Sequence, residues 1–219
     1  LALGNALLGN PPDAPALEVT LSGPTLRAEH RTACVVFGAA FAPRVDGRDP
    51  VRPGGTFMLE PGDVLRVGGT PTGVRGYLCV GGGFALPTIL GSRSALDPVK
   101  PGDVLTCGPS ASGRRVLPFD SLDEPMGVVR AVDGPQSDWF SQGGFFGVPF
   151  AVTAASNRMG LRLSGEAVPK RPGELASEPV APGAVQVTND GRPIVLGVDG
   201  QTIGGYPKVA HVIRADLDR

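Results

Sequence analysis

Glycine and proline occur throughout this chain and constrain its fold more than any other feature. They occupy 33 and 23 of the 219 positions, respectively. In a helix interior, glycine costs about 1 kcal/mol and proline about 3 kcal/mol relative to alanine, so long helical bundles are excluded. Because 41% of the residues are hydrophobic and the glycines follow no collagen-like period, a disordered or fibrous chain is excluded too. We therefore expect a folded protein of short strands and tight turns.

Short apolar or alternating runs between turn residues predict the strands. Residues 16–21 alternate in hydrophobicity and residues 33–37 are apolar throughout. Helix is expected only over residues 1–8, which stop before Gly9, and as a short turn over residues 136–140. The secondary structure is therefore expected to be mainly β.

Three similar Pro-Gly turns predict where further strands begin. They lie at residues 61–62, 101–102 and 182–183, and each precedes an apolar run. Proline presets the first turn dihedral and glycine supplies a positive φ, so each turn should lead directly into a strand. The recurrence also suggests duplicated β units.

A polar, proline-containing stretch at residues 109–125 interrupts the hydrophobic pattern and collects charged residues. Such a composition is typical of a domain boundary. We therefore expect two β domains, residues 1–118 and residues 119–219, each long enough to bury its own core.

Charge balance and cysteine spacing exclude several classes of protein. The net charge is −1, so no global field attracts nucleic acid or an anionic membrane. The longest uncharged run, residues 139–157, is broken by glycine and proline and is not a membrane helix. Cys34, Cys79 and Cys107 have no Cys-x-x-Cys spacing, so neither a disulfide framework nor a zinc site is expected. No signal peptide is visible, although the chain begins at Leu1, and a cytoplasmic, reduced protein is expected.

Familiar catalytic patterns are absent from the sequence. His30 and His211 have neither a metal-ligand spacing nor a nucleophile nearby, so structural or surface roles are expected. There is no Gly-x-x-x-x-Gly-Lys-[Ser/Thr] phosphate loop. The three glycines at residues 81–83 follow an apolar strand but no amphipathic helix follows them, which favours a tight β corner over a dinucleotide loop.

Three polar clusters are candidates for a functional site. Residues 156–163 interleave Arg158 and Arg162 with apolar residues, as expected of a half-buried strand. Residues 174–180 place two glutamates beside a proline. The densest cluster spans residues 198–208, where hydrogen-bonding groups of several kinds lie among three glycines that leave room for a ligand.

These clusters carry a family resemblance. Asn-Arg-Met-Gly-Leu-Arg-Leu at 157–163 and Gln-Thr-Ile-Gly-Gly-Tyr-Pro-Lys at 201–208 resemble, in order, motifs from the C-terminal half of the allophanate hydrolase subunit 2 family. That family includes KipA, the PxpC subunit of bacterial ATP-dependent 5-oxoprolinase, and the carboxyltransferase region of urea carboxylase. The other segments that resemble family positions are residues 7–10, 73–78, 90–94, 177–180, 182–187 and 193–196.

The chain departs from the family pattern in two places. Family members usually begin with a segment that contains Gln-Asp-x-Gly-Arg and Ser-Gly-x-x-Asp, and neither motif precedes Leu1. The glycine-rich segment that often follows the Gly-Ser-Arg-Ser motif is shortened here to residues 95–100. The first departure implies that the N-terminal domain lacks its first strands.

The resemblance implies two tandem cyclophilin-like β-barrels and a partner of the allophanate hydrolase subunit 1 (KipI or PxpB) type. It also implies that the complex uses ATP or, in the carboxylase alternative, biotin on a partner. This chain has no Ala-Met-Lys-Met biotinylation motif, so it is not itself a biotin carrier. No metal is implied.

The resemblance and the polar clusters together nominate site residues. The candidate reactions pass through negatively charged oxygens, which cations stabilise. Lys208, with Arg158, is expected to stabilise that charge, and Asp199 or Glu178 is the expected acid–base group. The residues expected to bind a small amide or carboxylate are Asn157, Arg158, Gln201, Thr202, Tyr206 and Arg75.

The function that this resemblance favours is that of a subunit of a heteromeric, ATP-dependent 5-oxoprolinase-type amide or lactam hydrolase. One alternative is the carboxyltransferase component of a biotin-dependent urea carboxylase in the allophanate pathway. A third possibility, from another class, is a non-catalytic KipA-like regulatory protein that binds a partner.

Overall fold

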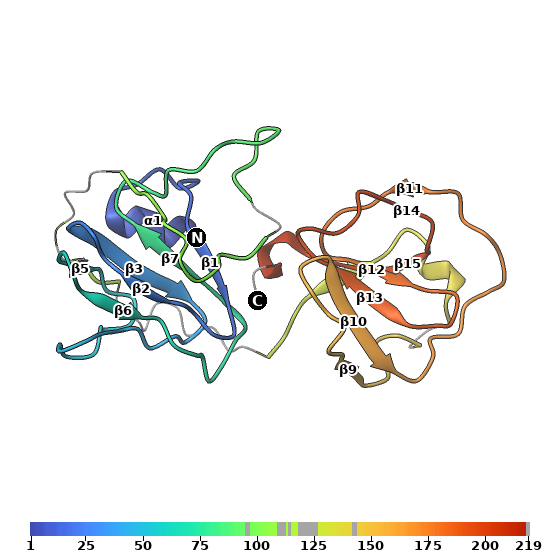
Figure 1. Ribbon diagram of the computed structural model, residues 1–219. Coiled ribbons are helices and arrows are strands. Elements are labelled where there is room, and N and C mark those ends of the chain that lie inside the picture. The colour runs from blue at the N-terminus through green and yellow to red at the C-terminus, as the bar shows by residue number, and fades with distance from the viewer. Residues whose placement is uncertain (95–96, 109–112, 114, 118–126, 142–143, 218–219) are drawn as a thin grey trace. The chain divides into compact units, whose positions relative to one another are not determined.

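Antiparallel strands dominate the computed structural model, which describes all residues except 95–96, 109–112, 114, 118–126, 142–143 and 218–219. The described residues contain one short α-helix and two 3-10 turns. The mainly β class expected from the sequence is confirmed. By its internal contacts the chain divides into two compact units, Leu1–Glu124 and Pro125–Arg219 (Figure 1). The boundary expected between residues 118 and 119 lies outside the described residues.

The described residues of the first unit form a helix and two small sheets. One sheet has the strand order β1-β7-β3-β5 and the other has the order β2-β6-β4. The elements of this unit are α1 (Ala2–Leu8), β1 (Leu17–Thr20), β2 (Thr25–Arg27), β3 (Thr32–Gly38), β4 (Arg44–Val45), β5 (Phe57–Leu59), β6 (Val64–Arg66) and β7 (Arg75–Val80).

Strand β3 forms the centre of the first unit because both of its faces are buried. Cys34 and Val36 point into the main core with Leu65, whereas Ala33 and Val35 point into a second cluster. Helix α1, which packs on β3 and β7, supplies two leucines to that second cluster. Alternate side chains of a strand point to opposite faces, so a strand covered on both sides is apolar throughout, as residues 33–37 are.

All three cysteines are free thiols and lie in the first unit. Burial raises the pKa of the Cys34 thiol to about 12 and that of the Cys79 thiol to about 11. At neutral pH these two side chains therefore remain protonated and act as small apolar core residues.

The second unit is built on a six-stranded antiparallel sheet with the order β8-β15-β12-β13-β10-β9, beside a ribbon of β11 and β14 (Figure 1). Its core gathers Phe140, Val185 and Val209. The elements are β8 (Ala131–Asp133), η2 (Ser137–Trp139), β9 (Phe150–Val152), β10 (Gly160–Gly165), β11 (Glu178–Pro179), β12 (Ala184–Val187), β13 (Pro193–Leu196), β14 (Ile203–Gly204), β15 (Lys208–Val212) and η3 (Arg214–Asp216).

The only tryptophan of the chain, Trp139, lies in this second unit. It packs against the core of the unit, and the Arg171 guanidinium lies 4.5 Å from the centre of its ring.

Among the described residues, no helix has both the length and the apolar composition needed to cross a bilayer.

Two of the three Pro-Gly turns act as the sequence predicts. Gly62 and Gly183 have φ values of 91° and 89°, and strands β6 and β12 follow them. Gly102 also has a positive φ. The prediction of a strand after it is wrong, because residues 103–105 form no strand and Val104 is 82% exposed. A strand needs a partner, and backbone pairing with the segment near Phe84 begins only at Thr106.

The strand expected over residues 156–163 begins later than predicted, at Gly160. Asn157 closes a tight turn in front of it, because its side-chain oxygen accepts a hydrogen bond from the Met159 N–H at 2.8 Å. Asn157 and Gly160 also exchange two backbone hydrogen bonds. Arg158 is therefore a turn residue, and of the two arginines only Arg162 lies in the strand.

A buried carboxylate links the last 3-10 turn to the start of the six-stranded sheet. The Asp216 side chain is fully buried and accepts hydrogen bonds from Arg130 N at 2.8 Å, Nε at 2.9 Å and Nη2 at 2.7 Å. The bonds from the Arg130 side chain and backbone lower the pKa of Asp216 to about 2.

Replacement of Asp216 by asparagine should lower the thermal stability at pH 7. The pKa of Asp216 in the folded state lies below the ordinary value of about 4, so its stabilisation is present above about pH 4 and is lost as the pH falls towards 2. The difference in Tm between wild type and Asp216→Asn, measured by circular dichroism, should therefore shrink between pH 4 and pH 2. The exposed Asp133→Asn variant serves as the control, and a difference in Tm that persists at pH 2 would contradict the assignment.

Candidate functional site

A buried lysine defines the centre of the candidate site. Lys208 is the first residue of β15 and only 5% of it is exposed. Its ammonium group donates a hydrogen bond to the Glu178 carboxylate at the start of β11. A buried charge is tolerated only when it is paired, so this contact fixes β11 against β15.

Gln136 completes the pairing from the loop after β8. Its side-chain Nε2 donates to Glu178 Oε1 at 2.8 Å, and its Oε1 accepts from the Lys208 backbone N–H at 3.1 Å. The hydrogen bonds from Lys208 and Gln136 hold the pKa of Glu178 below its usual value. Gly134 allows this approach, because a Cβ there would lie 2.2 Å from the Lys208 carbonyl oxygen.

Two further amides lie next to this pair. Gln186 on β12 is the register partner of Lys208, so both side chains point to the same face of the sheet. It is 1% exposed, and its Oε1 accepts from Gln201 Nε2 at 3.3 Å. Its own Nε2 has no hydrogen-bond partner among the described residues. Gly204, the register partner of Glu178, leaves room for both amides, because a Cβ there would lie within 2.7 Å of each amide nitrogen.

A second ion pair lies at the turn before β10. Arg158 Nε donates to one oxygen of Asp199, and Arg158 Nη2 donates to the other at 3.1 Å, in a two-pronged contact. Both side chains are about one third exposed. The backbones also meet, because Asp199 N donates to the Arg158 carbonyl at 3.1 Å. A Cβ at Gly197 would lie only 2.3 Å from that carbonyl oxygen, so glycine is required for the approach.

The remaining predicted residues make other contacts. Tyr206 lines a cavity of about 210 Å³ with Lys170 and Glu174. Thr202 has an exposed side chain, and its carbonyl accepts a hydrogen bond from Val180 N. Arg75 lies on β7 of the first unit, where its Nε is 3.1 Å from the Glu18 carboxylate. Arg75 therefore belongs to a different unit from the other candidates.

The structure thus groups the predicted residues into two pairs that the loop of residues 197–202 connects. Lys208 and Glu178 form one pair, and Arg158 and Asp199 form the other. Within that loop, Gln201 bonds Gln186, which is the register partner of Lys208 in the first pair. Asp199 is itself a member of the second pair.

Sequence reasoning missed Gln136 and Gln186. Gln186 gives a weak signal, a single amide inside the apolar run of residues 184–187. Gln136 follows Gly134-Pro135 but resembles any turn residue. Among the described residues, no three His, Cys, Asp or Glu side chains gather in a group that could hold a metal ion.

Comparison with known proteins identifies the family. The family model described as the carboxyltransferase domain, subdomain A and B, matches residues 1–219. The chain belongs to this carboxyltransferase family. It is 36% identical to the C subunit of 5-oxoprolinase from Escherichia coli (strain K12), over 99% of this chain and 74% of that protein. The resemblance drawn from the sequence motifs is therefore confirmed.

Solved structures also resemble this carboxyltransferase-family chain. The crystal structure of TTHA0988 superposes with a TM-score of 0.84 at 36% identity, over 99% of this chain. The urea amidolyase of K. lactis superposes with a TM-score of 0.87 at 26% identity. The chain spans 45% of the first protein and 15% of the second.

Replacement of Gly197 by alanine should disturb the second ion pair. The added Cβ would push the Arg158 carbonyl away and separate the two loops that hold Arg158 and Asp199. Such overpacking costs about 1–3 kcal/mol, which the urea midpoint of unfolding would report. Gly127→Ala is the matched control in the same unit, because a Cβ there would meet nothing within 4 Å. Equal midpoints for the two variants would show that the close approach does not matter.

Proposed function

We propose that the chain is the C-type subunit of an ATP-dependent 5-oxoprolinase, a hydrolase that opens the cyclic amide of 5-oxoproline to give glutamate. The 36% identity to the C subunit of a bacterial 5-oxoprolinase, over nearly the whole chain, carries this proposal. The name of that relative implies further subunits. The proposed partner of this chain is a subunit-1-type protein of the KipI or PxpB class, and the complex works in the cytoplasm with ATP as a co-substrate.

Each of the two units is proposed to be a cyclophilin-like barrel. The family resemblance supports this proposal, and so do the antiparallel sheets found in each unit. Residues 1–118 and 119–219 would then be the two barrel domains, and the site in the second barrel would be the one described above.

The charged pairs would act where negative charge develops on oxygen. Hydrolysis of an amide passes through an anionic oxygen, and a cation already fixed in place stabilises it without reorganisation. Lys208 has such a fixed position, because its ammonium group is paired with Glu178, and Gln136 bonds both the Glu178 carboxylate and the Lys208 backbone N–H. Glu178 accepts hydrogen bonds as the carboxylate and is the proposed acid–base group.

The amides and the second pair would hold the substrate. Gln186 has a buried N–H donor with no partner among the described residues, and Gln201 lies beside it. These donors suit a lactam carbonyl or a carboxylate oxygen. Arg158, fixed by Asp199, offers a planar guanidinium for a carboxylate. Asn157, Thr202 and Tyr206 remain the other proposed contacts in the second unit. Arg75 stays a separate proposed contact within the first unit.

A second candidate function is the carboxyltransferase step of a biotin-dependent urea carboxylase. The description of the matching family and the TM-score of 0.87 to K. lactis urea amidolyase favour it. In that reaction the same cations would stabilise the oxygens of a transferred carboxyl group, and the biotin would be attached to a partner.

The direct test is to express the chain together with a subunit-1-type protein and the remaining subunits of a bacterial 5-oxoprolinase. The purified complex should form glutamate from 5-oxoproline only when ATP is present. A biotinylated partner, detected by avidin blotting, with carboxylation of urea would favour the second candidate. A stable complex with no turnover of either substrate would instead support a KipA-like regulatory role.

Within that complex, Lys208→Met should lower the turnover by about 100-fold or more, because the cation that meets developing charge is lost. Methionine keeps the unbranched shape, and the partly exposed Glu178 can be hydrated once its partner is gone. Glu178→Gln should also lower turnover, and the double variant should lose little more than Lys208→Met alone, because the two side chains act as one unit.

The matched control is Lys100→Met, which removes an exposed lysine from the first unit. It should leave turnover unchanged. Full turnover of Lys208→Met in a correctly assembled complex would remove Lys208 from the mechanism.

A further inference from the structure

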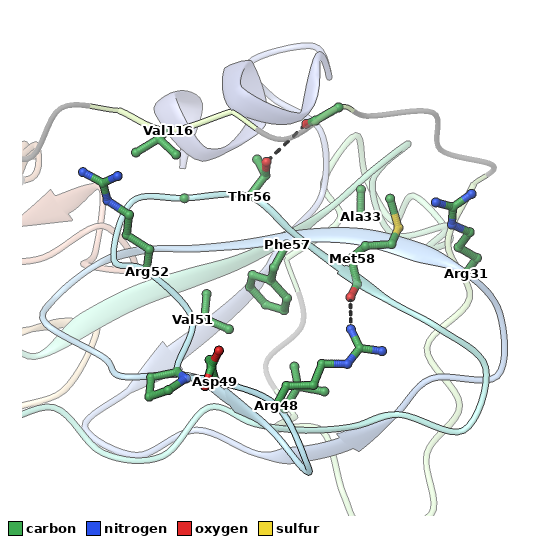
Figure 2. Close-up of a pocket in the computed structure, with 14 residues that line it drawn as sticks. Arg31, Ala33, Arg48, Asp49, Val51, Arg52, Thr56, Phe57, Met58 and Val116 are labelled. Carbon is green, nitrogen blue, oxygen red and sulfur yellow. Dashed lines mark hydrogen bonds between the residues drawn. The ribbon is translucent and has the colours of Figure 1, made fainter.

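A cavity of about 640 Å³ lies in the first unit, apart from every residue named in the proposed mechanism (Figure 2). Residues 48–52, the start of β5 and the segment around Val116 form its walls. Its volume falls within the range of about 300–1,000 Å³ that is typical of small-molecule pockets. Nothing in the proposed function accounts for it.

Backbone pairing fixes the wall of this cavity. Gly55 bridges Val116, and Thr56 N donates to the Arg115 carbonyl at 2.8 Å. The Thr56 hydroxyl is buried and bonds both Arg115 and the Gly113 carbonyl. Backbone pairing and the Thr56 hydroxyl therefore fix this wall of the cavity.

Part of the cavity wall is apolar. The Phe57 ring lies near Val51 in the middle of the view, whereas the Met58 side chain points to the other face, beside Ala33 (Figure 2). Phe57 and Val51 also pack against the main core of the unit, so this surface is held in place from behind. Such a surface suits an aromatic or aliphatic body.

Cations form another part of the cavity wall. Arg31, Arg48 and Arg52 line the cavity. Among the described lining residues there is no lysine, and Asp49 is the one acidic side chain. In Figure 2, Arg31 and Arg52 lie on opposite sides and Arg48 lies between them. The planar guanidinium, with its fork of N–H donors, matches carboxylate and phosphate groups better than an ammonium does.

The three arginines differ in how strongly they are engaged. Arg48 is held by the Asp63 carboxylate and by the Met58 carbonyl at 2.8 Å, so its position is fixed. Arg31 makes an exposed ion pair with Glu60 at 3.2 Å. Arg52 makes no side-chain hydrogen bond or ion pair with any described residue. Arg52 therefore offers all of its donors to a ligand, and the fixed Arg48 offers those that remain.

We propose that this cavity binds an organic anion, in which a carboxylate or phosphate group is attached to an apolar or aromatic body. The anionic group lies against Arg52 and Arg48, and the body lies on Phe57 and Val51. Asp49 accepts a hydrogen bond from a donor on the ligand and disfavours ligands of higher negative charge. The proposal is independent of the 5-oxoprolinase activity and needs no other subunit.

The test is a titration of the isolated chain followed by ¹H–¹⁵N NMR, with four probes. Phenyl phosphate and phenylacetate represent the two anionic groups, inorganic phosphate lacks the body, and benzyl alcohol lacks the charge. We expect saturable shifts at residues 48–58 and 115–117 with phenyl phosphate or phenylacetate, and the tighter of the two identifies the preferred group. Benzyl alcohol should bind at least about tenfold more weakly, a difference of about 1.4 kcal/mol.

Two variants and a matched control assign the contacts. Arg52→Gln should weaken the binding of the tighter-binding anion about tenfold. The control, Arg27→Gln, removes an exposed arginine on β2 outside the cavity and should leave that affinity unchanged. Phe57→Leu should lower the affinity for phenyl phosphate but leave the affinity for inorganic phosphate unchanged. The dispersion of the peaks in the same spectra shows whether each variant is folded. If Arg52→Gln is not folded, Arg52→Lys takes its place in the test.

Three results would overturn the proposal. They are the absence of saturable shifts at these residues with any anion up to about 10 mM, benzyl alcohol binding as tightly as the anions, and unchanged affinity in a folded Arg52 variant. None of these results bears on the glutamate-forming assay, so failure of this proposal and failure of the proposed function are distinguishable.

Discussion

The candidate site depends on one physical constraint, which is that an ammonium group inside a β unit must meet an anion. Lys208 lies almost unexposed at the start of β15, an interior strand of the sheet, and its anionic partner is Glu178, 30 residues away in the sequence. This requirement positions the β11–β14 ribbon against the six-stranded sheet. Gln136 adds a third chain segment to the same point and bonds both partners. A residue that is costly to bury thereby fixes three segments together.

Glycine makes these approaches possible. At Gly134, Gly197 and Gly204, a Cβ would lie within 2.7 Å of atoms of the site or of the loops that carry it. The abundance of glycine that excludes helices thus also allows backbone and side chains to pack closely around charged groups. Such sites are intolerant of substitution because the contacts at Gly134 and Gly197 are to backbone, which cannot rotate away.

Local signals in the sequence predict much of the fold. Helix α1 ends at Gly9, which adopts the left-handed conformation expected of a C-terminal glycine, and Gly62 and Gly183 begin strands as Pro-Gly turns should. The prediction fails where a strand needs a partner, as at Val104, and where a side chain closes a turn, as at Asn157. Both depend on contacts that local periodicity does not encode.

The residue types of the site were predictable, but their pairing was not. Motif similarity nominates Lys208, Glu178, Arg158 and Asp199, yet the two ion pairs join residues 30 and 41 positions apart. One sequence gives no distance between such residues. Gln186 was harder still to predict, because its importance comes from its burial and from a side-chain N–H that has no acceptor in the described part of the chain. Only the register between β12 and β15 places it beside Lys208.

The two units carry different natural reporters, which has a practical use. All three cysteines lie in the first unit, and the only tryptophan lies in the second. Cys34 and Cys79 are buried thiols with raised pKa values, so a thiol reagent reaches them only when the first unit opens. Thiol labelling and tryptophan fluorescence therefore follow the unfolding of each half of the chain separately, without any added label.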